Sequence, residues 1–130
     1  MSSSAVRAVV AGHGDLAAGL ISAVGSITGR ADALLPLTNL GLGAEQIEER
    51  LREALADGVR VIFTDLPAGS WTIAARRLMR TRPDLVLVTG VNLATLLDFV
   101  LRDDSAEEAA RHAVEKGRAA MLVSGATRGA

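Results

Sequence analysis

Three residues combine reactive side chains with positions that would expose them: His13, Asp65 and Ser70. His13 lies between Gly12 and Gly14, so neither adjacent residue has a side chain that would cover its imidazole. A neutral imidazole is a nitrogen nucleophile, and it changes protonation close to physiological pH. A carboxylate on one ring nitrogen would fix the tautomer and leave a lone pair on the other nitrogen. Asp65 is the candidate for that carboxylate.

Predicted helix starts next to these residues would supply hydrogen-bond donors. A helix is expected to begin near Asp15, and its unpaired backbone N–H groups would suit a phosphoryl group beside His13. Ser70 precedes the helix predicted over 72–81, so its hydroxyl or amide could donate to a phosphate oxygen. Ordinary structural interpretations stay open, because Asp65 could form an Asx-turn or an N-cap and Ser70 could be an N-cap.

A repeating order of strands and helices must position these side chains. Short apolar runs rich in Val, Ile and Leu predict buried strands, and apolar residues at helical spacing predict helices between them. The strands are expected over 5–11, 33–37, 59–64 and 85–89, with a last short strand over 119–124; the helices are expected over 16–29, around 47–55, and over 72–81, 93–101 and 105–117. The first helix should bury a face formed by Leu16, Leu20, Val24 and Ile27.

Strand–helix units of this kind predict an α/β fold, a doubly wound and mainly parallel sheet covered by helices on both faces. Reactive groups in such sheets belong at the carboxyl ends of the strands. His13 follows the first strand and Asp65 follows the third, so they would share one crevice if those strands are neighbours.

Length and composition limit the possible functions. With 130 residues, 49% of them hydrophobic, the chain should form a single domain over 1–130, ordered over about 5–125. A net charge of −1 and 2% aromatic residues argue against nucleic-acid binding. The absence of cysteine excludes disulfides and thiol ligands, and we expect no metal and no organic cofactor. No signal-peptide pattern and no apolar run near 18 residues occur, so we expect a cytoplasmic protein.

Three further features bear on the possible functions. Residues 12–17 fit the dinucleotide-binding pattern G-x-G-x-x-G/A, but Asp32, the expected ribose ligand, precedes the second strand instead of ending it. His112 is expected on a helix surface without a partner. Trp71 is expected either to pack over a neighbouring helix or to join a docking surface.

Three segments together resemble a known family. They are Val9–Gly14, Phe63–Ser70 and Thr89–Leu93, and their order and spacing resemble the mannose-type (mannose/fructose/N-acetylgalactosamine) enzyme IIA of the bacterial sugar phosphotransferase system. The resemblance covers roughly Val6 to Gly125.

The resemblance implies a phosphotransferase without a cofactor, which accepts a phosphoryl group from the carrier HPr and passes it to enzyme IIB. Enzyme IIB then phosphorylates a sugar entering through a membrane permease, so contact with the membrane is indirect. His13 would carry the phosphoryl group on Nε2, Asp65 would hold Nδ1–H, and Ser70 would contact the phosphate. Gly12, Gly14 and Gly69 would shape the turns around it.

The family also implies a strand order of 2-1-3-4 and a homodimer in which a C-terminal strand, here 119–124, can be exchanged between subunits. The chain departs from the family pattern at Ala68 and Trp71, where Gly and Pro are common, so the loop on the phosphate side and the surface that meets enzyme IIB are expected to differ from the family's. Two other functions stay open on the same fold. One is a regulatory domain that acts by binding a protein, and the other is a phosphocarrier for dihydroxyacetone kinase, whose first turn usually reads Ser-His-Ser. A flavodoxin-like domain without phosphate chemistry is the structural alternative.

Overall fold

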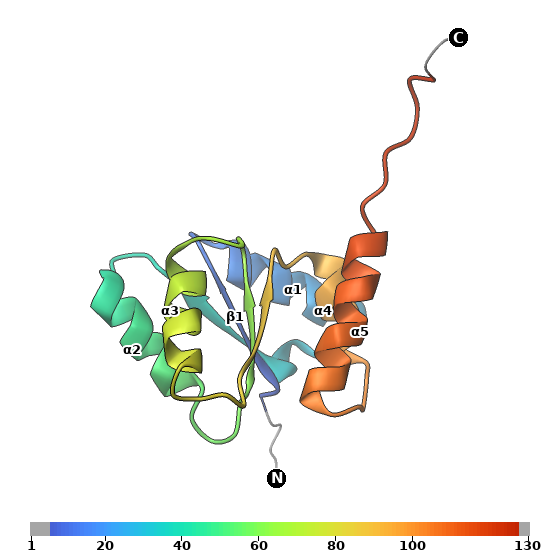
Figure 1. Ribbon diagram of the computed structural model, residues 1–130. Coiled ribbons are helices and arrows are strands. Elements are labelled where there is room, and N and C mark those ends of the chain that lie inside the picture. The colour runs from blue at the N-terminus through green and yellow to red at the C-terminus, as the bar shows by residue number, and fades with distance from the viewer. Residues whose placement is uncertain (1–5, 128–130) are drawn as a thin grey trace.

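Strands and helices alternate along most of residues 6–127, which are the residues that the computed structural model describes (Figure 1). The elements are β1 (Ala8–Gly12), α1 (Leu16–Thr28), a 3₁₀ turn η1 (Ala31–Ala33), β2 (Leu34–Thr38), α2 (Ala44–Ala54), β3 (Val61–Thr64), α3 (Ser70–Met79), β4 (Val86–Thr89), α4 (Leu93–Val100) and α5 (Ala106–Ala119). None of the helices in this part of the chain has the length and apolar character needed to cross a membrane.

The strands form one sheet in the order β2-β1-β3-β4, and every neighbouring pair is parallel. This confirms the predicted α/β class and strand order. The register pairs Gly12 of β1 with Thr38 of β2, and Ala11 of β1 with Thr64 of β3. The carboxyl ends of three adjacent strands therefore stop at nearly the same level, and the loops that follow them start side by side.

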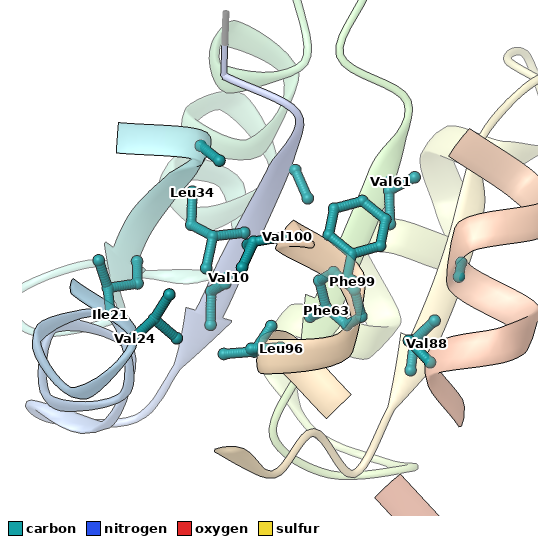
Figure 2. Close-up of a cluster of buried hydrophobic side chains, with 14 of the residues drawn as sticks. Val10, Ile21, Val24, Leu34, Val61, Phe63, Val88, Leu96, Phe99 and Val100 are labelled. Carbon is teal, nitrogen blue, oxygen red and sulfur yellow. The ribbon is translucent and has the colours of Figure 1, made fainter. Parts of the chain in front are cut away.

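Alternate side chains of each strand point into two separate cores. Val10 and Phe63 pack with α1, α4 and α5 on one face of the sheet, and Figure 2 shows this cluster. Phe63 meets Phe99 of α4 edge to face, with ring centroids 5.1 Å apart. Val9 and Ile62 point to the other face, where they pack with α2 and α3. Because both faces are covered, the central strands β1 and β3 are almost entirely apolar, as the sequence pattern predicted.

The buried face of α1 differs from the expected one. Ala17, Ile21 and Val24 are buried, whereas Leu16 and Ile27 are exposed. The apolar stripe of this helix is wider than the surface that it buries, so periodicity alone did not fix its rotation. The small side chain of Ala17 faces the core, and Leu16 is left at the surface beside the first turn.

Two other boundaries differ from the sequence prediction. Helix α3 begins at Ser70, earlier than the range 72–81, because Gly69 takes the extended N-cap conformation with φ 169°. Helix α5 continues through Ala119 and no strand forms over residues 121–127 of the single chain. That segment leads away from the body of the molecule (Figure 1).

Candidate functional site

His13 and Asp65 meet at the carboxyl ends of β1 and β3. Ring Nδ1 of His13 lies 2.6 Å from Asp65 Oδ2, and the backbone N–H of His13 donates to the same oxygen at 2.9 Å. The side chain of His13 is 46% exposed and that of Asp65 is 9% exposed. The two loops thus converge as the sequence predicted, with the imidazole at the surface and the carboxylate beneath it.

The hydrogen bonds decide which ring nitrogen carries the proton. Burial raises the pKa of the Asp65 carboxyl, but the hydrogen bonds from the ring and backbone of His13 outweigh burial and lower that pKa below its usual value. Asp65 is therefore ionised at neutral pH and can only accept hydrogen bonds. Nδ1 of His13 must donate, so the neutral ring keeps its lone pair on Nε2.

The start of α3 lies against the edge of the same imidazole. A Cβ built on Gly69 would be 3.8 Å from His13 Cε1, the ring carbon between the two nitrogens. The first intrahelical hydrogen bond is from Ile73 N–H to the Gly69 carbonyl at 2.9 Å. The backbone N–H groups of Ser70, Trp71 and Thr72 precede it and so lack a partner within the helix. This end of α3 carries partial positive charge next to the nucleophile.

Ser70 is the first residue of α3, and its side chain is exposed. The N-cap is Gly69, so Ser70 does not have the N-cap role considered for it from the sequence. Gly12 is closely surrounded, since a Cβ there would be 3.2 Å from Leu16 Cδ2 and 3.5 Å from Asp65 Oδ2. A side chain at this position would press on the carboxylate that holds His13.

Two buried hydroxyls that sequence reasoning missed fix the loop between β3 and α3. Thr64 Oγ1 and Thr72 Oγ1 lie 2.7 Å apart, and the Thr72 hydroxyl donates to the Leu66 carbonyl at 2.6 Å. Both threonines are almost completely buried. Their bonds tie the end of β3 to the first turn of α3, and so set the distance between Asp65 and the helix N-terminus. In the sequence, the signal that could have identified Thr64 is a polar residue at the end of an otherwise apolar strand.

The end of β2 and the loop after it contribute a second missed pair. Thr38 Oγ1 donates to the Gly14 carbonyl at 2.8 Å, and the Gly14 N–H donates to Asn39 Oδ1 at 3.2 Å. Thr38 and Asn39 directly follow the strand predicted over 33–37, and nothing in the sequence assigns them a role. Their contact with the residue after His13 depends on β2 being the other neighbour of β1.

Trp71 takes the packing role, one of the two roles that the sequence left open for it, whereas His112 differs from its prediction. Trp71 is fully buried among α2, α3 and the sheet, so it is a packing residue and cannot join a docking surface. His112 of α5 has a partner after all, because its Nδ1 lies 2.8 Å from Asp98 Oδ2 of α4. Both residues of this second pair lie on helices, away from the strand ends that converge at His13.

Within residues 6–127 no group of three or more His, Asp or Glu side chains is placed to hold a metal ion. The chemistry that His13, Asp65 and the start of α3 can perform is nucleophilic attack by Nε2 on an electrophile that brings negative charge, such as a phosphoryl group. Asp65 would stabilise the imidazolium that forms, and the helix N–H groups would face the transferred anion.

Comparison with known proteins gives a family match over most of the chain. Residues 7–116 match the sequence model of the EIIA-man family, described as the fructose IIA component of the PTS system. No curated protein sequence matches the chain.

Several solved structures share the fold. The mannose/sorbose specific IIA subunit of the phosphotransferase system from Enterococcus faecalis superposes with a TM-score of 0.81 at 22% identity, covering 96% of this chain and 98% of that one. Phosphotransferase system component EIIA from Streptococcus agalactiae gives 0.80 at 17% identity, covering 90% and 95%. A sigma-54 interaction domain protein from Enterococcus faecalis gives 0.67 at 16% identity, covering 91% and 94%.

Proposed function

Because this chain belongs to the EIIA-man family of phosphotransferase-system IIA components, we propose that it is a cytoplasmic phosphocarrier that uses His13. In this proposal His13 accepts a phosphoryl group from phospho-HPr and passes it to an enzyme IIB for sugar uptake. The observation that carries the proposal is the 2.6 Å contact between His13 Nδ1 and Asp65 Oδ2, which leaves Nε2 as the nucleophilic nitrogen.

The transfer step follows from that geometry. The Nε2 lone pair attacks phosphorus while the bond from phosphorus to the donor imidazole breaks, and the donor nitrogen keeps the electron pair. His13 keeps its Nδ1 proton, so the ring becomes cationic as the phosphoryl group adds about two negative charges. Asp65 stabilises the cation through Nδ1–H. The same steps in reverse deliver the group to the acceptor nucleophile on enzyme IIB.

The N-terminus of α3 supports the phosphoryl group in this proposal. Gly69 lies next to the ring edge, and the N–H groups of Ser70 and Trp71 lack helical partners, so they can donate to phosphoryl oxygens together with the Ser70 hydroxyl. The turn formed by residues 12–15 contains no Lys or Arg. Stabilisation by dipoles alone is modest, which suits a carrier that must release the group again.

An apolar rim around His13 suits transient docking of the two partner proteins. Leu16 and Leu66 are large and exposed. Leu16 begins α1 directly after the His13 turn, and Leu66 follows Asp65 in the other turn. Pro67 is exposed beside them. A few exposed apolar side chains favour binding without the slow release of a large apolar interface.

The proposal includes a homodimer formed by exchange of the C-terminal segment. Met121, Leu122 and Val123 are 81%, 85% and 97% exposed, which is unusual for three consecutive apolar residues. Strand β4 is at the edge of the sheet, and a groove of about 570 Å³ runs along it between α3 and α5. An apolar segment of a second copy, added to β4 as a strand, would cover both surfaces.

The experiment is phosphorylation by enzyme I, HPr and phosphoenolpyruvate, with His112→Ala as the matched control for His13→Ala. We expect alkali-stable, acid-labile phosphate on the wild-type chain and on His112→Ala, and none on His13→Ala. The control is informative because His112 also has a carboxylate partner on Nδ1. Label that persists in His13→Ala would refute the proposal.

A regulatory role on the same fold is the second candidate, and the structural likeness to the sigma-54 interaction domain protein favours it. The phosphoryl group would then change binding to another protein without passing to an enzyme IIB. The third candidate, a carrier for dihydroxyacetone kinase, is disfavoured by the Gly12-His13-Gly14 turn. Genes for a permease and an enzyme IIB beside this gene would favour transport, and kinase subunit genes would favour the third.

A further inference from the structure

The turn that carries His13 is held from both sides, and only one side belongs to the His13–Asp65 pair. Strand register places Thr38 of β2 opposite Gly12, so the loop after β2 starts beside the His13 turn. At the end of β2 Thr38 Oγ1 donates to the Gly14 carbonyl at 2.8 Å, and in the loop that follows Asn39 Oδ1 accepts from the Gly14 N–H at 3.2 Å. Two consecutive side chains thus bind both polar groups of one glycine.

These bonds act on the backbone on the far side of His13 from Asp65. The His13 N–H, in the peptide before its Cα, donates to Asp65 at 2.9 Å. The Gly14 N–H belongs to the peptide after that Cα, and it donates to Asn39. With a hydrogen bond on each flanking peptide, neither φ nor ψ of His13 can rotate without breaking one of them. The direction of its Cα–Cβ bond is therefore fixed, and from that direction the ring's hydrogen bond to Asp65 sets the position of Nε2.

Gly14 itself needs this support. Its φ of +58° lies in the left-handed region, where the chain makes the sharp change of direction into α1. A glycine is the residue with the most conformational freedom to lose, so an unrestrained turn here would sample other conformations. The Thr38 hydroxyl also accepts from the Leu40 N–H at 3.3 Å, which connects the Gly14 carbonyl to the backbone of the β2–α2 loop.

We propose that Thr38 and Asn39 are positioning residues for phosphoryl transfer, which hold the two peptides on either side of the Gly14 Cα, and with them the turn that carries His13, so that Nε2 meets the incoming phosphorus in line. The inference rests on the proposed function of His13. It also assigns the Gly14 N–H to Asn39, which leaves the phosphoryl group to the N–H groups at the start of α3. A misplacement of about 1 Å at a reacting atom can cost about a hundredfold in rate.

The test compares Thr38→Val, which keeps the shape but lacks the hydroxyl, with Thr38→Ser, which keeps the hydroxyl. We expect Thr38→Val to lower the single-turnover rate of transfer from phospho-HPr by between about tenfold and a hundredfold. Thr38→Ser should transfer at close to the wild-type rate. A wild-type rate for Thr38→Val, or an equally slow Thr38→Ser, would overturn the inference.

Two additions keep the test independent of folding and of the proposed function. Asn39→Leu removes the acceptor at a half-buried position and should slow transfer in the same direction, and it replaces Thr38→Val if that variant fails to fold. The ¹⁵N resonances of the His13 ring report the Nδ1–H tautomer without any phosphoryl donor. In Thr38→Val and Asn39→Leu we expect these resonances to shift toward the values of a mixture of the two neutral tautomers. In Thr38→Ser they should stay unchanged. Unchanged resonances in Thr38→Val and Asn39→Leu would overturn the positioning role, whereas an unlabelled wild type would refute only the proposed function.

Discussion

Asp65 Oδ2 accepts two hydrogen bonds from one residue, His13, at 2.6 Å from ring Nδ1 and at 2.9 Å from the backbone N–H. One carboxylate oxygen therefore fixes both the tautomer of the imidazole and the start of the turn that carries it. The two residues are 52 positions apart in the chain, so this relationship depends on β1 and β3 being neighbours.

The first prediction concerns the charge of Asp65. Asp65→Asn keeps the shape but lets an amide donate to the ring, which favours the proton on Nε2 and removes the nucleophilic lone pair. We expect transfer from phospho-HPr to slow by at least about a hundredfold while the circular dichroism spectrum is unchanged. Rapid-quench experiments with labelled phospho-HPr measure the transfer rate. Equal rates for wild type and Asp65→Asn would exclude Asp65 from this role.

The second prediction is a dependence of stability on acid. The hydrogen bonds from His13 hold the pKa of the Asp65 carboxyl below its unfolded value of about 3.9, even though burial opposes them. A lowered pKa stabilises the folded state above the unfolded pKa, and that stabilisation is lost as pH falls through the folded pKa. Urea unfolding between about pH 5 and pH 2.5 should therefore show a steeper loss for wild type than for Asp65→Asn. Parallel curves would contradict this.

The third prediction concerns the contact between α4 and α5. A Cβ on Gly117 would overlap Thr95 Oγ1 and lie 3.0 Å from Asn92 Oδ1, so Gly117→Ala must displace these side chains or the helices that pack there. We expect a loss of about 1–3 kcal/mol in the free energy of unfolding. Gly19→Ala is the matched control, because nothing lies within 4 Å of its Cβ position in α1. That variant should gain about 0.5–1 kcal/mol; equal effects of the two would count against the clash.

The fourth prediction concerns the buried Trp71. Its side chain is fully buried, and among residues 6–127 its Nε1–H has no hydrogen-bond partner. Trp71→Ala should cost about 3–5 kcal/mol through the cavity that it leaves. Trp71→Phe should cost much less, because it also removes a buried donor without a partner. Chemical denaturation followed by circular dichroism measures both, and equal losses would show that the indole N–H is satisfied in solution.

The fifth prediction tests the proposed strand exchange. If residues 121–127 of one copy cover β4 of another, the full chain has the mass of a dimer by light scattering. A chain ending at Ala120 should have the mass of a monomer, and Leu122→Asp in the full chain should weaken the dimer. A dimer that survives both changes would place the interface elsewhere.

Much of the fold could be predicted from the sequence, because alternating apolar strands and amphipathic helices follow directly from side-chain type and period. The rotation of α1 could not, since its apolar stripe exceeds the face that it buries, and Leu16 came out exposed where Ala17 was buried. The burial of Trp71 also depended on how closely α3 packs on the sheet.

The sequence by itself determined the reactive group, a histidine between two glycines at a strand end, and a carboxylate at another strand end. Which loops meet follows from the three-dimensional fold, because strand order is set by packing between distant segments and is not encoded in local period. Thr38 and Asn39 illustrate this. Nothing in the sequence marks either residue as functional, and they contact Gly14 only because β2 lies beside β1.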